Sequence, residues 1–375
     1  MLLVVDRKET TLRYQNQTIR MEREGKATRT IPIRQLEQVV VYGNPLVESS
    51  VWRALADAGV PATLLPGRGQ SGHAVLGAGL AVRLPFRRMQ HRFASDPALS
   101  IELARYFVRQ KLLGYLLPLR TLNALYPVDL KANNAFSLSL VETTNKLSAA
   151  SDVSSLMGLE GQLAQAWFVL LAKSLPFKWK FAGRNRRPPL DPVNAVLSLG
   201  YTLMGAEVRQ AVISQGLDPA LGFLHQDYPG RESLVLDVTE IFRAGVDDFM
   251  LRWLHDAELD EGSFYFRDDT GCRLSKVARP LFYKAWGASR YRWPRPFESG
   301  GEYDLVDEDD ADIPMEVTEP EWPVAWLPEI LNGQVMQLRE YMKRLDPESK
   351  EVEHEVIAAG DGAFGVESGL EDDED

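Results

Sequence analysis

The hydrophobic pattern of this chain changes its period once, near Phe86. Before that residue, short β-rich runs alternate with turn residues, which is typical of strands in a half-buried sheet. The runs are Leu2 to Val5, Thr11 to Tyr14, Thr18 to Met21, Arg29 to Ile33 and Gln38 to Tyr42. After Phe86, apolar residues recur at helical spacing. We therefore expect an α+β fold, with a small N-terminal antiparallel β domain over residues 1–80 and a larger, mainly α-helical domain over residues 86–295.

Three Asp-Pro pairs carry the signal for the start of a helix, because Asp caps free backbone N–H groups and Pro suits the first helical turn. They are Asp96-Pro97, Asp191-Pro192 and Asp218-Pro219. Each pair predicts a helix that begins there. Within the β-rich part, residues 50–58 also have helical character.

Charge is divided unevenly along the 375 residues. After Gly300 there are 24 acidic and 4 basic side chains, a net charge of -20, which leaves 29 acidic and 38 basic side chains before it, a net charge of +9. A basic body favours a polyanionic partner, because clustered Lys and Arg displace counterions from nucleic acid. We expect residues 296–375 to form an acidic, proline-containing extension that is partly disordered, with one docked helix over residues 326–345. Shielding of a DNA surface, docking of a partner and solubility remain open as its role.

The composition also excludes several classes of protein. The single cysteine, Cys272, cannot form an internal disulfide or a cysteine-rich metal site. No run approaches the roughly 18 apolar residues of a membrane span, and the first residues lack the pattern of a signal peptide. We expect a soluble, cytoplasmic protein without a membrane partner. Phosphate-loop, HExxH and GxSxG motifs are absent from the sequence.

Glu160 is the first candidate for chemistry. It lies within an apolar helical stripe that includes Leu156, Leu163 and Trp167. A carboxylate on such a face needs a partner, which can be an Arg, a hydrogen bond or a metal ion. The pattern itself leaves these three alternatives open.

Asp237 and Glu240 follow on a helix predicted from about Ser233, and their spacing of three residues places both carboxylates on one face. His225 precedes them across a short turn. A lone His is often structural, and an acidic pair is often a solvated helix face. Together with Glu160, however, these residues form a His-plus-carboxylate set that suits Mg²⁺ or Mn²⁺. Such an ion supports phosphoryl transfer.

A basic loop with the sequence Arg-Asn-Arg-Arg-Pro-Pro lies between these blocks, at residues 184–189. The loop is either merely solvated or held extended by its prolines, with its guanidinium groups free to bind phosphates. The candidate DNA-binding residues are Arg184, Arg186, Arg187 and Arg231. We interpret the aromatic residues nearby, Trp167, Phe181 and Tyr201, as core rather than as base-stacking residues.

Four blocks, taken in order, resemble the CRISPR-associated integrase family, the catalytic subunit of the spacer-acquisition machinery. They are residues 156–161, 183–203, 216–225 and 231–243. The resemblance extends over about residues 1–290, and the acidic extension departs from it. It implies that Glu160, His225 and Glu240 bind the metal ion, with Asp237 as a further acidic residue of the catalytic site.

The resemblance also implies partners and a reaction. The partners are double-stranded and branched DNA, a second copy of the chain bound through the β domains, and a small bridging subunit. The reaction is the insertion of short DNA fragments into a CRISPR array, by attack of a 3′-hydroxyl on a phosphodiester. A structure-selective nuclease acting on branched repair intermediates and a non-catalytic DNA-binding scaffold remain as alternatives.

Overall fold

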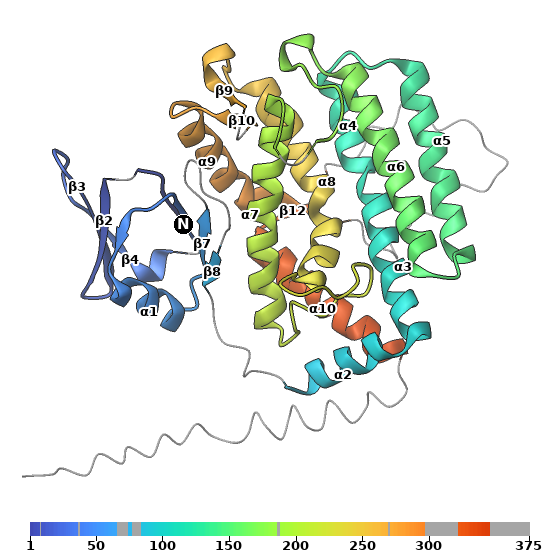
Figure 1. The fold of residues 1–375 in the computed structure, drawn as a ribbon, viewed down its shortest axis with the longest axis horizontal. Coiled ribbons are helices and arrows are strands. Elements are labelled where there is room, and N and C mark those ends of the chain that lie inside the picture. The colour runs from blue at the N-terminus through green and yellow to red at the C-terminus, as the bar shows by residue number, and fades with distance from the viewer. Residues whose placement is uncertain are drawn as a thin grey trace, which may run out of the picture.

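The computed structural model describes residues 1–7, 9–36, 38–65, 74–76, 84–185, 188–268, 271–296 and 322–345. An N-terminal β region lies beside a larger helical region (Figure 1). The α+β fold class is therefore confirmed.

The N-terminal strands form two four-stranded sheets, ordered β1-β5-β7-β8 and β4-β3-β2-β6. The bounds are β1 Leu2–Val5, β2 Thr10–Gln15, β3 Thr18–Arg23, β4 Arg29–Pro32, β5 Gln38–Tyr42, β6 Leu46–Val47, α1 Ser49–Asp57, β7 Ala62–Leu65 and β8 Ala74–Leu76, with a short 3₁₀ turn η1 at Ile33–Gln35. All five predicted strands are present. The helical character expected near residue 50 corresponds to α1.

The strand pairing is mixed, so the expectation of a purely antiparallel domain is wrong in this detail. β2 pairs with β3, β3 with β4, and β7 with β8 in antiparallel fashion. β1 and β5, β5 and β7, and β2 and β6 pair in parallel. For β5 and β7 the physical reason is α1, which carries the chain back so that β7 runs in the same direction as β5.

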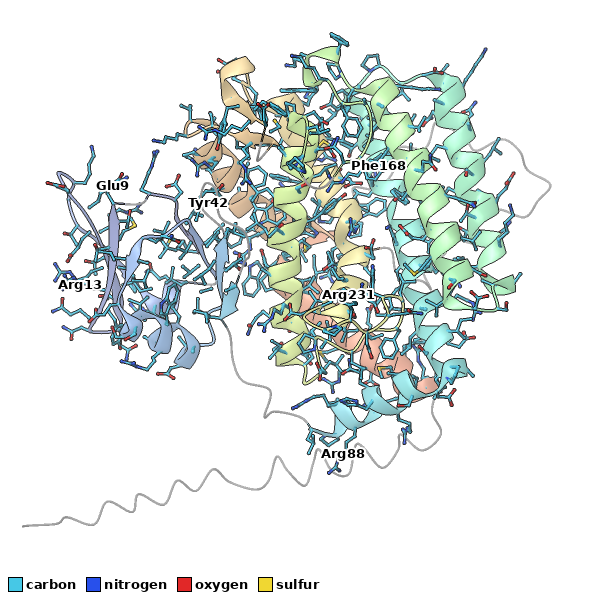
Figure 2. All side chains as sticks on the ribbon, in the orientation of Figure 1. Glu9, Arg13, Tyr42, Arg88, Phe168 and Arg231 are labelled. Carbon is cyan, nitrogen blue, oxygen red and sulfur yellow. The ribbon has the colours of Figure 1, made fainter. Side chains whose placement is uncertain are left out.

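Strand β5 joins the two regions. Its side chains alternate between the faces of the sheet, so Val39 and Val41 fill the core of the β region while Val40 belongs to the core of the helical region. At the end of the strand, the guanidinium of Arg279 lies 4.7 Å from the ring centre of Tyr42. Tyr42 is labelled where the two regions meet in Figure 2. The helical region therefore packs directly on the sheet.

The helical region is built around one central helix, α8. The bounds of the helices are α2 Leu84–Ser95, α3 Pro97–Gly114, α4 Leu116–Leu125, α5 Leu130–Lys146, α6 Val153–Ser174, α7 Pro192–Ser214, α8 Ser233–Asp256, α9 Ala278–Ser289 and α10 Leu327–Leu345. Short 3₁₀ turns lie at η2 Leu147–Ala149, η3 Phe177–Trp179, η4 Glu261–Ser263 and η5 Arg290–Arg292. α8 packs against α3, α4 and α7, and side chains on all of its faces are buried.

Two of the three predicted helix starts are correct. Asp96 caps α3 and Asp191 caps α7, each with its carboxylate accepting backbone N–H groups and a Pro in the first turn. The third is wrong, because Asp218 and Pro219 lie in a turn that leads to α8. There the backbone N–H groups after Gly222 bind a side chain of α8 instead of continuing a helix.

The C-terminal part adds a hairpin and a docked helix to the helical region. β9 Phe264–Arg267 pairs with β10 Gly271–Leu274, and β11 Trp293–Pro294 pairs with β12 Val324–Ala325. α10 forms where a docked helix was expected, and packs against α7 with Leu331, Val335 and Leu338 in the core. The predicted disorder of residues 297–321 and 346–375, and the predicted boundary near residue 80, lie outside the described residues. In the part that the structure describes, no helix is both long enough and apolar enough to cross a membrane.

Candidate active site

Two of the predicted site carboxylates meet at one cation between α3, α6 and α8. Lys111 Nζ, from α3, donates to Glu160 Oε1 on α6 and to Glu240 Oε2 on α8. Lys111 and Glu240 are buried, with 7% and 5% of their surface exposed. Two acidic side chains 80 positions apart in the sequence are thus brought to a single point. We call these three residues the Lys111 centre.

A second cation acts on Glu240 from its own helix. Arg243 Nε lies 2.8 Å from Glu240 Oε2, one helical turn further along α8. Burial disfavours the charged form of Glu240, but Arg243 and Lys111 outweigh it and lower the pKa of this carboxyl to about 2. Glu240 is therefore an anion at every pH at which the protein would work.

His225 is held by Asp237. Its Nδ1 lies 2.7 Å from Asp237 Oδ1, which directs its other ring nitrogen, Nε2, away from that carboxylate. A carboxylate partner favours the tautomer with the proton on Nδ1 and leaves Nε2 as a possible metal ligand. The charge of His225 also contributes to lowering the pKa of Glu240, so the two groups are electrostatically coupled.

Asp237 fixes the loop before α8 as well as the imidazole. It is fully buried and accepts hydrogen bonds from the backbone N–H groups of Phe223, Leu224 and His225 at 2.6, 3.0 and 2.9 Å. A β-carbon at Gly222 would lie 2.7 Å from the backbone of Ser233 and 2.9 Å from Asp237 Oδ2, so this approach requires glycine. The resemblance placed Asp237 in the catalytic site as a further acidic residue, and in the structure its contacts position His225.

Within the described residues, no group of three or more His, Cys, Asp and Glu side chains is placed so that it could hold a metal ion. The donor chemistry nevertheless fits, because Glu160 and Glu240 already converge on one positive charge, and carboxylate oxygens with one imidazole suit Mg²⁺ or Mn²⁺. Of the three partners considered for Glu160, the structure supplies an ion pair, with Lys111 in place of the expected Arg. Metal binding by Glu160, His225 and Glu240 stays a prediction.

The predicted DNA-binding arginines have local structural roles. Arg184 donates to the backbone oxygen of Asn185 and, at 2.7 and 3.2 Å, to the side chains of Asn194 and Ser198 on α7. Arg231, labelled in Figure 2 beside the start of α8, donates to the backbone oxygen of Gln226. Arg186 and Arg187 lie outside the described residues.

A buried hydrogen-bonded group formed by Asp247, Tyr201 and Trp167, the Asp247 group, was not predicted from the sequence as part of the site. Asp247, on α8, accepts from the Tyr201 hydroxyl and from Trp167 Nε1, the latter at 2.8 Å. Burial raises the pKa of Asp247 to about 6, although both hydrogen bonds oppose this shift. The ring of Tyr201 also receives the guanidinium of Arg243, 4.6 Å from its centre. The group therefore braces Arg243, and through it Glu240.

Sequence signals for the missed residues were weak. Asp247 is one of several acids in the sequence of α8, so its residue type does not distinguish it. Lys111 follows Arg109 and Gln110 in α3, so its neighbours in the sequence do not indicate burial. Trp167 and Phe181 are buried, as expected.

Comparison with known proteins identifies the family of the chain. The family model described as CRISPR associated protein Cas1 matches residues 3–288. The chain belongs to the Cas1 family. A CRISPR-associated endonuclease Cas1 of Thermodesulfovibrio yellowstonii is 31% identical over 284 residues, which cover 74% of this chain and 88% of that relative. One from Thermus thermophilus is 34% identical over 258 residues, 68% of this chain and 74% of the relative.

Solved structures share the Cas1 fold at low sequence identity. A casposase bound to an integration product has a TM-score of 0.73 at 17% identity, covering 92% of this chain and 91% of that one. A Cas1 protein from Thermotoga maritima has a TM-score of 0.71 at 19% identity, covering 91% and 97%. These likenesses concern the fold.

Proposed function

We propose that this Cas1 family member is a divalent-metal-dependent DNA integrase and endonuclease that inserts short DNA fragments into a CRISPR array. The observation that carries the proposal is the Lys111 centre, where two carboxylates from different helices converge on one buried positive charge. Beside it, a buried carboxylate orients His225. Relatives that match most of the chain are named CRISPR-associated endonucleases, which supports the same chemistry.

Glu160, Glu240 and Nε2 of His225 would hold Mg²⁺ or Mn²⁺. When bound, such an ion supplies charge neutralisation at a phosphate oxygen and activation of an attacking hydroxyl. Asp237 keeps the imidazole oriented through its contact with Nδ1. For these carboxylates to hold an ion, Lys111 would have to lie away from them, because one point cannot hold both cations. Arg243 and the Asp247 group hold Glu240 in place.

The reaction needs no covalent protein intermediate. The 3′-oxygen of the incoming fragment forms a bond to phosphorus, and the bond from phosphorus to the target's 3′-oxygen breaks. The proton of the attacking hydroxyl is balanced by the one that the departing 3′-oxygen takes up. One phosphodiester replaces another, so no energy source is required. Water in place of the hydroxyl gives hydrolysis, which is the nuclease activity on branched DNA.

The partners belong to the same proposal. We expect double-stranded and branched DNA, a homodimer formed through the β region, and a small bridging subunit. The net charge of +9 before residue 301 supports a polyanionic partner. One structure with the same fold, at a TM-score of 0.69 and 20% identity, is titled a Cas6-RT-Cas1–Cas2 complex, and another, at 0.50 and 18%, a Cas1–DNA complex. We place the protein in the cytoplasm, where CRISPR arrays reside.

A strand-transfer assay tests the proposal. A labelled duplex fragment with free 3′-hydroxyls is incubated with a supercoiled plasmid carrying a repeat, in Mg²⁺ or Mn²⁺, with and without the small subunit. We expect a joined product that disappears on chelation and in Glu160→Ala and His225→Ala. Glu142→Ala is the matched control, because this carboxylate is 68% exposed on α5.

The other possible results of the strand-transfer assay would contradict the proposal in different ways. Cleavage without joining, even with the small subunit present, would contradict integration and favour a repair nuclease. DNA binding with neither product would favour a non-catalytic scaffold. Joined product that survives both substitutions would contradict the site assignment.

A further inference from the structure

The turn after α6 exposes an aromatic ring among lysines. Phe177, at the start of η3, is 92% exposed, the highest value among the large hydrophobic residues in the described part of the chain. Three exposed lysines surround it in sequence, Lys173 in the last turn of α6 and then Lys178 and Lys180. We call Phe177 with these lysines the η3 surface.

The positive charges of the η3 surface are not neutralised within the described structure. Neither the Lys173 ammonium nor the Lys180 ammonium has a hydrogen bond or ion pair with any residue that the structure describes. The ammonium of Lys178 lies 4.5 Å from the ring centre of Trp179, a contact that adds no negative charge. Three adjacent unpaired cations attract a polyanion.

The turn that presents Phe177 is well anchored. Trp179 is 3% exposed and packs edge to face on Phe264 of β9, with 6.0 Å between the ring centres. Lys180 has a left-handed backbone with φ of 51°, a conformation that non-glycine residues adopt only where the surroundings enforce it. Phe177 is therefore held outward by a fixed turn. Its exposure is not the result of a loose loop.

We propose that the η3 surface binds unpaired DNA, with a base stacked on Phe177 and phosphates contacting the lysines. Aromatic rings beside cationic side chains are the usual means of holding single strands without sequence preference. Protein interfaces instead deplete lysine, which disfavours a protein partner at this position. The inference rests on the proposed function, since it assigns a contact to the same DNA substrate.

The position of the η3 surface suits a substrate that also reaches the Lys111 centre. Glu160 and Ser174 lie on the same helix, α6, 14 residues apart, which is about 21 Å of helix. That length corresponds to about six stacked nucleotides. A strand engaged at Glu160 would therefore need about six or more unpaired nucleotides to extend to Phe177.

Equilibrium binding of the full-length chain to DNA in EDTA tests this without any catalytic step. The probes are a 12-nucleotide single strand carrying 2-aminopurine and a blunt duplex of the same sequence. Phe177→Ala should weaken single-strand binding about 5-fold or more and abolish the quenching of 2-aminopurine, while duplex binding changes less than about 2-fold. Phe177→Trp should retain both. Leu138→Ala is the matched control, because Leu138 is 65% exposed on α5.

The salt dependence of DNA binding tests the contribution of the lysines separately. Replacing Lys178 and Lys180 together by Ala should reduce the slope of log affinity against log salt by about 1.4 for the single strand.

Phe177→Ala behaving like Leu138→Ala, or weakening single-strand and duplex binding equally, would overturn the inference and leave the proposed function intact. Loss of the small subunit from Phe177→Ala with unchanged DNA affinity would overturn it in favour of a protein interface. A wild-type chain that binds neither DNA would overturn the inference and the proposed function together.

Discussion

Charged side chains at the Lys111 centre are paired and mostly buried, with Glu160 21% exposed, whereas those of the η3 surface are exposed and unpaired. Inside, Lys111, Glu160, Glu240 and Arg243 nearly balance one another, and each depends on its neighbours because an isolated buried charge is costly. Outside, Lys178 and Lys180 are solvated and need no partner for stability. Substitutions inside should therefore change stability and chemistry, while substitutions at the η3 surface should change only DNA binding.

Lys111→Met should have the largest effect on stability. It leaves two carboxylates facing each other, and breaking such a buried arrangement typically costs about 3–5 kcal/mol. Urea unfolding in EDTA measures the loss, and Mn²⁺ should then stabilise the variant more than the wild type by replacing the missing cation. Lys146→Met is the control, because that ion pair with Glu142 is mostly exposed. Equal stability of the two variants in EDTA would contradict the pairing argument.

Asp237→Asn should have the next largest effect, lowering the free energy of unfolding by about 3 kcal/mol or more. One carboxamide oxygen cannot accept the four hydrogen bonds that the two carboxylate oxygens now receive, and its NH₂ group faces N–H donors. Joined product should fall as well, because His225 loses its orientation. Urea unfolding and the strand-transfer assay check the two effects. A variant with normal stability but no activity would instead make Asp237 a direct participant in the reaction.

Asp247 gives the interior a pH dependence. Its pKa in the folded state, about 6, lies above the ordinary value of 3.8, so the folded protein binds a proton more tightly than the unfolded chain. Stability from this group is therefore complete below about pH 4 and is lost as pH rises through about 6, by up to about 3 kcal/mol. The difference in unfolding free energy between wild type and Asp247→Asn isolates this term. A difference that stays constant from pH 4 to 7 would contradict it.

Phe177→Ala should have the smallest effect on folding, within about 0.5 kcal/mol of wild type, because the side chain is almost fully exposed. Its DNA affinity should nevertheless fall. Thermal unfolding next to Leu138→Ala checks the first expectation. A clear loss of stability in Phe177→Ala would mean that the ring packs against other groups in solution. That result would contradict the description of the η3 surface as exposed.

The fold was predictable where local chemistry decides it. The change of period near Phe86 separated the β region from the helices, and the caps at Asp96 and Asp191 marked two helix starts. Parallel pairing of β1 with β5 was not predictable, because strand pairing is decided by contacts distant in sequence. The start expected at Asp218 failed because the loop's N–H groups bind Asp237 on the following helix.

Residue type and spacing selected the acids and the histidine of the candidate site, and their role stays a prediction. Lys111 meets Glu160 and Glu240 only when α3 packs against α6 and α8, which the sequence does not indicate. The η3 surface was hidden for a different reason. Phe177, Trp179 and Phe181 alternate with lysines like a half-buried strand, yet the structure buries the last two rings and exposes the first.

The most direct test measures the rate of strand transfer against DNA concentration for two variants in parallel. Glu160→Gln should lower the maximal rate at least about 100-fold without shifting the DNA concentration that gives half of it. Phe177→Ala, assayed on fragments with single-stranded 3′ tails, should shift that concentration about 5-fold or more and leave the maximal rate unchanged. The reverse pattern, or a loss of maximal rate in both variants, would contradict the division between a paired reaction centre and an unpaired binding surface.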